Sequence, residues 1–328
     1  MGKSLPPKFV IRTGQWVWTT MWQIMMSNLA PRDAQGAYVR PASEFRDRIG
    51  NERFPPAAGR YCLYVGMSCP WAHRTLIVRA LKGLHRAIAL TVVSPAPTEG
   101  GWVLTEPEAG CYRLADVYQK AQPGYEGRST VPLLWDSQTQ SIVNNESADL
   151  IVMLNDQFNA FAESPELDLY PEALQSQIEA WNVKIYPTVN NGVYRCGFAQ
   201  TQTAYNEACA ALFATLDEIE ATLKENRYLC GDRLTLADVR LFTTLFRFDA
   251  VYFGLFKCNR RRIRDYPNLE GYLRDIYQLP GVAETCDLEA VKQDYYGNLF
   301  PLNPGGIIPA GPDLNYLGQP HHREQSVH

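Results

Sequence analysis

The sequence Gly66-Met67-Ser68-Cys69-Pro70-Trp71-Ala72-His73-Arg74 joins a predicted strand to a predicted helix. Residues 60–66 alternate and carry β-formers, which is typical of a strand. Residues 71–84 have apolar side chains at helical spacing, and residues 87–93 form the near-continuous apolar run of a buried parallel strand. A strand, a helix and a strand in about 35 residues predict a βαβ unit with a right-handed crossover.

The same stretch predicts a reactive sulfur. Cys69 would cap the helix N-terminus, with Pro70 at the first helical position, where its missing N–H costs nothing. Free N–H groups and the helix dipole there favour a thiolate, which is the nucleophilic form. Ala72 stands where dithiol oxidoreductases carry a second cysteine, so an external thiol has to resolve any mixed disulfide. We therefore predict a monothiol site.

The chain continues with two strand-like runs, at residues 131–135 and 141–143, and a helix over residues 146–155. The order βαβ followed by ββα is the thioredoxin-like arrangement. Pro132 then stands where such folds hold a cis-proline, which exposes the backbone of the preceding Val131 to a peptide-like ligand.

The start of the predicted helix at Asn144-Asn145-Glu146-Ser147 suits a ligand with two charged ends. Helix N–H groups and Ser147 can hold a carboxylate, while Glu146 can take an α-ammonium. Taken alone, Asn and Ser here are ordinary helix caps. The combination with Cys69 and Pro132 favours glutathione.

We expect two domains with an extension at each end, because 328 residues correspond to roughly two domains. An N-terminal arm covers residues 1–55, an α/β thioredoxin-like domain 56–160, an all-helical domain 161–290 and a wrapping tail 291–328. Residues 94–128 are rich in Pro and Gly and predict a long loop inserted in the first domain. Helices are expected at 172–185, 202–226, 235–254 and 267–278, the third opened by a Thr235–Asp238 capping box. The tail from residue 292 has too much Pro and Gly for regular structure.

Charge and cysteine content exclude several classes of protein. The chain has 31 Lys plus Arg and 35 Asp plus Glu, a net charge of −4, which argues against a nucleic-acid binder. Eight cysteines without a CxxC pair, and five histidines without zinc-finger spacing, predict no disulfide scaffold and no metal site. Most of the cysteines should be buried thiols in a reducing compartment.

The aromatic-rich stretch 16–30 contains too many polar residues for a membrane span and lacks the pattern of a signal peptide. We expect it to pack on the body or on a second subunit. The expected location is the cytoplasm, with no membrane partner.

Several motifs together resemble the glutathionyl-hydroquinone reductases, the Xi class of glutathione transferases. The resemblance covers about residues 30–315. It is carried by Cys69-Pro-Trp-Ala-His-Arg-Thr75, Gly127-Arg-Ser-Thr-Val-Pro132, Ile142-Val-Asn-Asn-Glu-Ser147, and residues 192–198, 238–244, 247–249, 251–252, 256–259, 261–262, 265–269, 294–296 and 303–307. It implies an all-α glutathione-transferase domain after the thioredoxin-like one, and a homodimer.

The resemblance also implies a reaction. Cys69 would attack the sulfur of a glutathionyl-hydroquinone, release the hydroquinone and keep glutathione as a mixed disulfide. A second glutathione would release glutathione disulfide. Glutathione is then a co-substrate, and no tightly bound cofactor is expected.

The family's site residues can be carried over to matching positions of this chain. Its glutathione site corresponds to Trp102, Arg128, Val131, Glu146 and Ser147. Its aromatic-substrate pocket corresponds to Tyr194, Tyr252 and one of Tyr295 or Tyr296, with Tyr295 favoured, and Tyr194 and Tyr295 are candidate catalytic phenols beside Cys69.

One position departs from the family pattern. The family often has His-Tyr-Tyr in the tail, whereas this chain has Asp294-Tyr295-Tyr296, so tail packing or the preferred aromatic substrate is expected to differ. Two alternatives stay open: a broader monothiol transferase acting on dehydroascorbate or protein mixed disulfides, and a non-catalytic carrier of quinones or porphyrins.

Overall fold

A six-stranded mixed sheet forms the first domain, with strand order β4-β3-β2-β1-β5-β6. The computed structural model describes residues 7–96, 101–108 and 110–323. β1 runs parallel to β2 and antiparallel to β5, which pairs antiparallel with β6. The predicted thioredoxin-like fold is confirmed. The strands are β1 (Tyr61–Val65), β2 (Ile88–Pro95), β3 (Trp102–Glu108), β4 (Cys111–Arg113), β5 (Leu133–Asp136) and β6 (Ser141–Asn144).

The segment expected to be a long loop contains regular structure. β3 and β4 form an antiparallel pair that extends the sheet beyond β2, and helix α3 (Leu114–Ala121) follows. Leu104, Leu114 and Tyr118 from this segment are buried in the core. The prediction was wrong because most of the Gly residues lie in turns between short elements, while Pro95 and Pro107 lie at or near the ends of strands.

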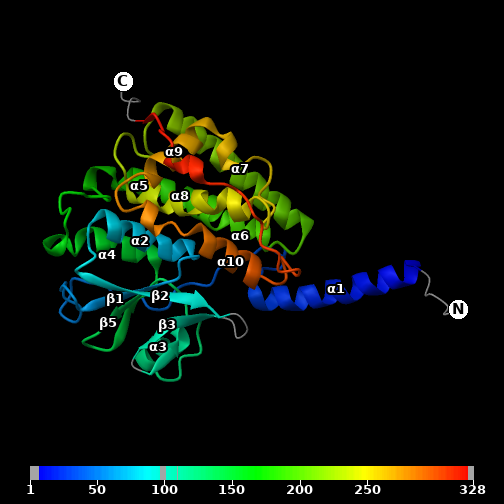
Figure 1. The fold of residues 1–328 in the computed structure, drawn as a ribbon, viewed down its shortest axis with the longest axis horizontal. Coiled ribbons are helices and arrows are strands. Elements are labelled where there is room, and N and C mark those ends of the chain that lie inside the picture. Colours follow the sequence, from blue (N-terminus) through cyan, green and yellow to red (C-terminus); the bar gives the residue numbers. More distant parts are fainter. Residues whose placement is uncertain (1–6, 97–100, 109, 324–328) are drawn as a thin grey trace.

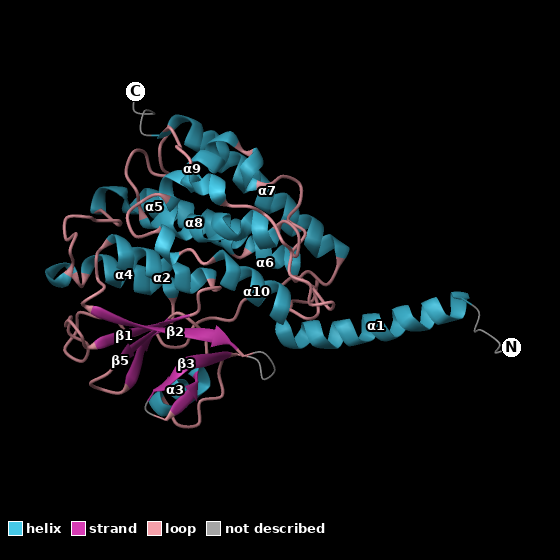
Figure 2. Ribbon diagram, viewed as in Figure 1, coloured by secondary structure: helices cyan, strands magenta, loops and turns pink. Residues whose placement is uncertain are grey.

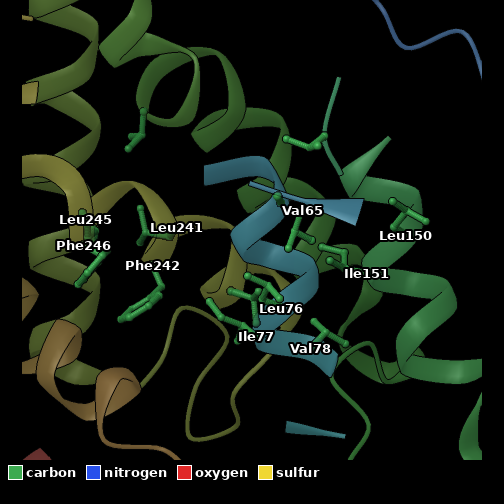
Figure 3. Packing of buried hydrophobic residues seen from close by; sticks show 14 of the residues in the cluster. Val65, Leu76, Ile77, Val78, Leu150, Ile151, Leu241, Phe242, Leu245 and Phe246 are labelled. Atoms are coloured by element: carbon green, nitrogen blue, oxygen red, sulfur yellow. The ribbon is translucent and has the colours of Figure 1, made fainter. Parts of the chain in front are cut away.

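Helices α2 (Pro70–Leu81) and α4 (Ser147–Asp156) cover the sheet, and the second domain stacks on them (Figures 1 and 2). In Figure 3, Ile77 of α2 lies in a cluster that Ile151 of α4 and Phe242 of α8 (Leu236–Arg247) also enter. All three side chains are fully buried, and each contributes about 1.5–3 kcal/mol by leaving water. The helix that starts at Cys69 is therefore fixed by both domains.

The second domain is all-helical, as predicted. The α7 and α9 bounds agree with the expected helices to within one residue at each end, and the Thr235–Asp238 capping box is present. The helix expected over residues 235–254 is α-helical only as far as Arg247, and a π-helical turn, Phe248–Tyr252, follows it. The remaining helices are α5 (Gln175–Ile185), α6 (Gly192–Gly197), α7 (Gln202–Glu225), α9 (Pro267–Tyr277) and α10 (Leu288–Asn298).

The tail becomes irregular later than predicted. α10 continues to Asn298 because Asp287 caps its start and Val291 and Tyr295 are buried against the body. After it the chain crosses the helical domain, where the buried Arg323 guanidinium donates hydrogen bonds to main-chain carbonyls around the end of α7.

Helix α1 (Pro7–Leu29) projects away from the body in Figure 1. Met26 near its end is buried, but most earlier apolar side chains are exposed. The expectation that this segment packs on the body is therefore wrong for all but its last residues. In the part of the chain that the structure describes, no helix combines the length and apolar character needed to cross a membrane.

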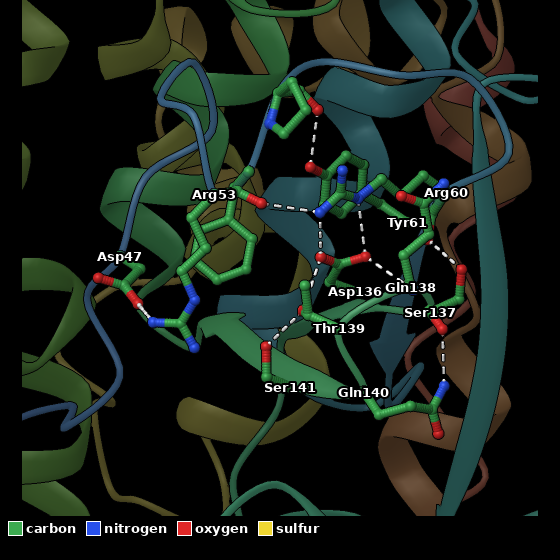
Figure 4. A network of polar contacts seen from close by, with 12 residues as sticks. Asp47, Arg53, Arg60, Tyr61, Asp136, Ser137, Gln138, Thr139, Gln140 and Ser141 are labelled. Carbon is green, nitrogen blue, oxygen red and sulfur yellow. Dashed lines mark hydrogen bonds and ion pairs between the residues drawn. The ribbon is translucent and has the colours of Figure 1, made fainter.

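A buried ion pair ties β1 to β5 at the far end of the sheet from Cys69. Arg60 donates through Nε (2.8 Å) and Nη2 (2.5 Å) to the two carboxylate oxygens of Asp136 (Figure 4). Thr139 and the Gln138 N–H donate to the same carboxylate. Burial alone would raise the pKa of Asp136, but the hydrogen bonds from Arg60 and Thr139 hold it below its usual value.

Candidate active site

Cys69 caps the N-terminus of α2, as the sequence predicts, with Pro70 as the first helical residue. Its N–H donates to the Gly66 carbonyl at 3.0 Å, and its own carbonyl accepts the His73 N–H at 3.0 Å. Its Sγ lies 3.6 Å from the Val131 carbonyl oxygen. The sulfur is therefore held between the start of α2 and the segment that precedes β5.

The start of α2 favours the thiolate, as predicted, but it does not set the net direction of the pKa shift of Cys69. Burial raises the pKa of Cys69 and outweighs the opposing effects of the Ala72 and Trp71 N–H groups and the Arg247 and Arg40 cations. The helix terminus and nearby positive charges do favour the thiolate, but removal of the sulfur from water costs more.

The Val131–Pro132 peptide bond is cis, as expected for this position of the fold. Both residues line a cavity of about 210 Å³. The N-terminal arm contributes Arg40 to Glu44, and α2 contributes Trp71. The segment before β5 contributes Tyr125 to Arg128 and Thr130, and the start of α4 contributes Asn145 to Ser147. Its surface is mostly polar, so we call it the polar cavity.

Glu146 and Ser147 lie at the floor of the polar cavity. Glu146 caps α4 by accepting the Ala148 N–H at 3.0 Å, and its second carboxylate oxygen accepts from the Ser43 hydroxyl at 2.9 Å. Ser147 is buried and accepts from Arg74 at 3.3 Å. A carboxylate, a hydroxyl and a helix start in one small cavity suit a zwitterionic peptide end.

A second cavity of about 250 Å³ opens beside the sulfur, and we call it the aromatic cavity. It shares Arg40, Trp71 and Arg128 with the polar cavity. Cys69 lines the aromatic cavity, and its Sγ contacts the carbonyl oxygen of Val131, which lines the polar one. The other lining residues are Leu29, Tyr38, Ser68, Pro70, Trp102, Tyr194, Phe198, Asp294, Tyr295 and Leu299.

Trp102 reaches the aromatic cavity from β3, on the side of the first domain. Its ring lies so close to Gly66 that an added Cβ there would come within 2.3 Å of it. Glycine is therefore required at position 66, directly after β1. The segment after β2 places the Trp102 ring in the wall of the aromatic cavity.

The hydroxyl groups of three tyrosines lie close together at the wall of the aromatic cavity that the second domain forms. Tyr194 and Tyr295 are in direct hydrogen-bond contact, and the Tyr252 hydroxyl lies 3.5 Å from Tyr194 and 3.2 Å from Tyr295. Burial raises the pKa of all three phenols, so each keeps its proton at neutral pH. Tyr194 and Tyr295 line the aromatic cavity, while Tyr252 is buried behind them.

The comparisons with known proteins agree with this geometry. Residues 68–157 match the family model of the glutathione S-transferase N-terminal domain, and residues 202–275 match that of the C-terminal domain. The chain is 46% identical to the glutathionyl-hydroquinone reductase YqjG of Escherichia coli over 88% of this chain and 93% of that protein. It is 45% identical to the glutathionyl-hydroquinone reductase PcpF of Sphingobium chlorophenolicum, over 90% and 94%.

Two solved structures are also similar to this chain along most of its length. The glutathione-bound structure of the Escherichia coli protein has a TM-score of 0.81, covering 86% of this chain and 96% of that one. The Xi glutathione transferase of Phanerochaete chrysosporium has a TM-score of 0.83 at 46% identity, covering 85% and 94%.

The chain belongs to the Xi class of glutathione transferases. In this Xi-class chain the structure brings together most of the residues predicted from the sequence. Arg128, Val131, Glu146 and Ser147 line the polar cavity, and Trp102, Tyr194 and Tyr295 line the aromatic one with Cys69.

Tyr296 does not join the aromatic cavity. Its hydroxyl donates to the Ala250 carbonyl at 3.1 Å, and its ring faces a separate cavity beside the tail. Asp294, the departure from the Xi-class pattern, accepts a hydrogen bond from the Ser68 hydroxyl and reaches the wall of the aromatic cavity.

Sequence reasoning missed Arg40 and Tyr38, which the N-terminal arm places in the walls. The Arg40 guanidinium lies 4.1 Å above the Trp71 ring, and Arg74 lies 4.6 Å from the same ring. No periodicity marks these residues, because the arm crosses the site as irregular chain; only its length before β1 hinted at a role.

His73 of α2 has a fully buried side chain that contacts residues of the second domain. It accepts from Arg247 at 2.9 Å through Nδ1 and contacts the Thr285 hydroxyl at 2.9 Å through Nε2. Burial and the Arg247 charge lower the pKa of His73 well below its usual value. It is therefore a neutral link between domains and does not reach the sulfur's cavity.

Proposed function

We propose that this chain is a glutathionyl-hydroquinone reductase, as its close Xi-class relatives are named. One observation carries the proposal: Cys69 stands at the junction of a polar cavity suited to glutathione and an aromatic cavity suited to a hydroquinone ring. A thioether that joins these two groups would place its sulfur beside Cys69.

The reaction has two steps. The Cys69 thiolate attacks the glutathione sulfur and breaks the bond from that sulfur to the aromatic carbon, which takes a proton and leaves as part of the hydroquinone. The thiolate of a second glutathione then attacks the mixed disulfide, frees Cys69 and forms glutathione disulfide. The proton gained by the ring is balanced by the one lost from the second glutathione.

The residues divide between the two cavities. Glu146, Ser147, Arg128 and the Val131 backbone would bind the glutathione part, and the proposal is supported by their shared position around one cavity. Tyr194 and Tyr295 would hydrogen-bond the hydroquinone hydroxyls, and one of them would supply the proton to the ring carbon. Trp102 would cover the sulfur from the opposite side.

The proposed setting is a homodimer in the cytoplasm. No disulfide joins two cysteines in the part of the chain that the structure describes, which fits a reducing compartment. Glutathione acts as a co-substrate. Among residues 7–96, 101–108 and 110–323, no cluster of His, Cys, Asp and Glu side chains could hold a metal ion.

The test is the stoichiometry of glutathione disulfide release from a glutathionyl-hydroquinone and excess glutathione, with Cys69→Ala as control. We expect one glutathione disulfide per hydroquinone in the wild type and no turnover in the variant. Binding without turnover in the wild type would instead favour a carrier. A loss of activity only toward aromatic substrates in Tyr194→Phe would separate the aromatic chemistry of a hydroquinone reductase from the chemistry of a broader monothiol transferase.

A further inference from the structure

Helix α1 presents apolar side chains to solvent over most of its length. Phe9, Trp16 and Ile24 are about 60–70% exposed. A helix of 23 residues spans about 34 Å. Exposed apolar surface of this extent marks an interaction site. The other exposed apolar residues of α1 are Val10, Ile11, Val17, Trp18 and Met21.

The polar residues of α1 follow a single stripe. The spacing of four, three, four and four residues places them on one face of the helix. The stripe carries both charged side chains of α1, and the wide remaining arc is apolar except for Thr13, Gly14, Thr20 and two residues near its end. The stripe consists of Lys8, Arg12, Gln15, Thr19 and Gln23.

Charge is segregated toward this end of the chain. The first 32 residues contain Lys3, Lys8, Arg12 and Arg32 and no carboxylate, although the chain as a whole has a net charge of −4. The α1 helix of a second copy would offer these cations no carboxylate to pair with, because α1 contains no Asp or Glu. An anionic surface complements them.

We propose that α1 lies in the interface of an anionic lipid membrane, with its apolar arc toward the acyl chains and its Lys8–Arg12 stripe toward the headgroups. Basic residues on the polar face, indoles on the apolar arc and too little length of apolar run to span are the features of interfacial helices. This revises the expectation of no membrane partner.

The C-terminal end of α1 lies at the aromatic cavity. Its last residue, Leu29, lines the aromatic cavity together with Cys69. A membrane-bound α1 brings the wall of that cavity to the lipid surface, into which an apolar aromatic product can partition. This consequence rests on the proposed function, but membrane binding itself does not.

The experiment is flotation of the full chain with vesicles of phosphatidylglycerol and phosphatidylcholine, and with phosphatidylcholine alone. Two variants each add one negative charge to an exposed position of α1: Val17→Glu on the apolar arc and Gln15→Glu on the polar stripe. One charge near an anionic surface changes partitioning by about 5-fold. We expect that loss for Gln15→Glu, and a loss of about 50-fold or more for Val17→Glu, which also places a carboxylate in the acyl region.

Turnover of a water-soluble substrate without vesicles should be the same in both variants and the wild type. This separates failure of membrane binding from failure of the proposed reaction. The proposal is overturned if the wild type does not float, or if Val17→Glu floats as well as Gln15→Glu. A wild type that fails to float and forms a larger assembly than Val17→Glu in sedimentation velocity would instead show that a second copy covers α1.

Discussion

Arg247 donates a hydrogen bond from Nε to the main-chain carbonyl of Ser68 at 2.9 Å, although 179 residues separate the two in sequence. Its Nη2 donates to the Met67 carbonyl at 3.1 Å. Arg247 is fully buried at the end of α8 and also binds His73. The loop that carries Cys69 in the first domain is therefore held in place by a cation from the second.

Replacing Arg247 with Met should reduce kcat/KM by about 10-fold or more, because two carbonyls before Cys69 lose their donor and the loop is no longer fixed. The lost donors should also cost about 2–4 kcal/mol of stability. Since the Arg247 charge lowers the pKa of Cys69, the pH midpoint of Cys69 alkylation should rise in Arg247→Met and less in Arg247→Lys. An unchanged pH midpoint of Cys69 alkylation in Arg247→Met would contradict the effect of the Arg247 charge on the pKa of Cys69.

The pH dependence of the wild-type thiol provides a second test. Burial raises the pKa of Cys69, so the thiol is mostly protonated at neutral pH and becomes thiolate as the pH rises. The rate of iodoacetamide alkylation at Cys69 should increase through a midpoint at or above that of an ordinary cysteine, about 8.5. Cys69→Ala measures the background from the other thiols. A midpoint below 7 would mean that the helix terminus dominates after all.

The Arg60–Asp136 ion pair should matter far more than an exposed one. Arg60→Met leaves a fully buried carboxylate without its partner, and should cost about 3–5 kcal/mol in urea unfolding. Asp47→Asn breaks the exposed ion pair with Arg53 and should cost about 0–1 kcal/mol. Equal losses of unfolding free energy in Arg60→Met and Asp47→Asn would contradict the prediction that the buried ion pair matters more than the exposed one.

The same pair predicts a pH dependence. The pKa of Asp136 is lowered in the folded protein, so its stabilisation is complete above the unfolded value, about 3.9, and is lost as the pH falls through the folded value. The stability difference between wild type and Arg60→Met should therefore shrink on acidification below about pH 4. Denaturant midpoints measured from pH 7 downward would check this.

Neighbouring tyrosines offer a matched pair of variants. Tyr295→Phe removes a phenol that lines the aromatic cavity, and should lower turnover of a glutathionyl-hydroquinone by about 10- to 100-fold or more. Tyr296→Phe removes a hydroxyl that hydrogen-bonds the backbone of Ala250 and Leu255, away from the aromatic cavity, so its turnover should match the wild type with a stability loss of about 1 kcal/mol. Equal turnover in the two variants would remove Tyr295 from the proposed mechanism.

The sequence predicts those parts of the site whose signals are local. Cys69 before a proline and a helix, Pro132 before a strand, and Glu146 at a helix start each reveal their position within a few residues. Arg247 and Arg40 could not be found this way, since they reach the site from distant segments with ordinary surroundings. The β3–β4 pair was missed because its strands are short and separated by Gly and Pro.

The shared wall of Arg40, Trp71 and Arg128 has a kinetic consequence. In the proposed reaction, the polar cavity still holds the glutathione attached to Cys69 once the first half-reaction is complete. The second glutathione would then approach through the aromatic cavity, which lies across this wall, after the hydroquinone has departed. We therefore expect parallel double-reciprocal plots, and inhibition by the released hydroquinone in competition with the incoming glutathione.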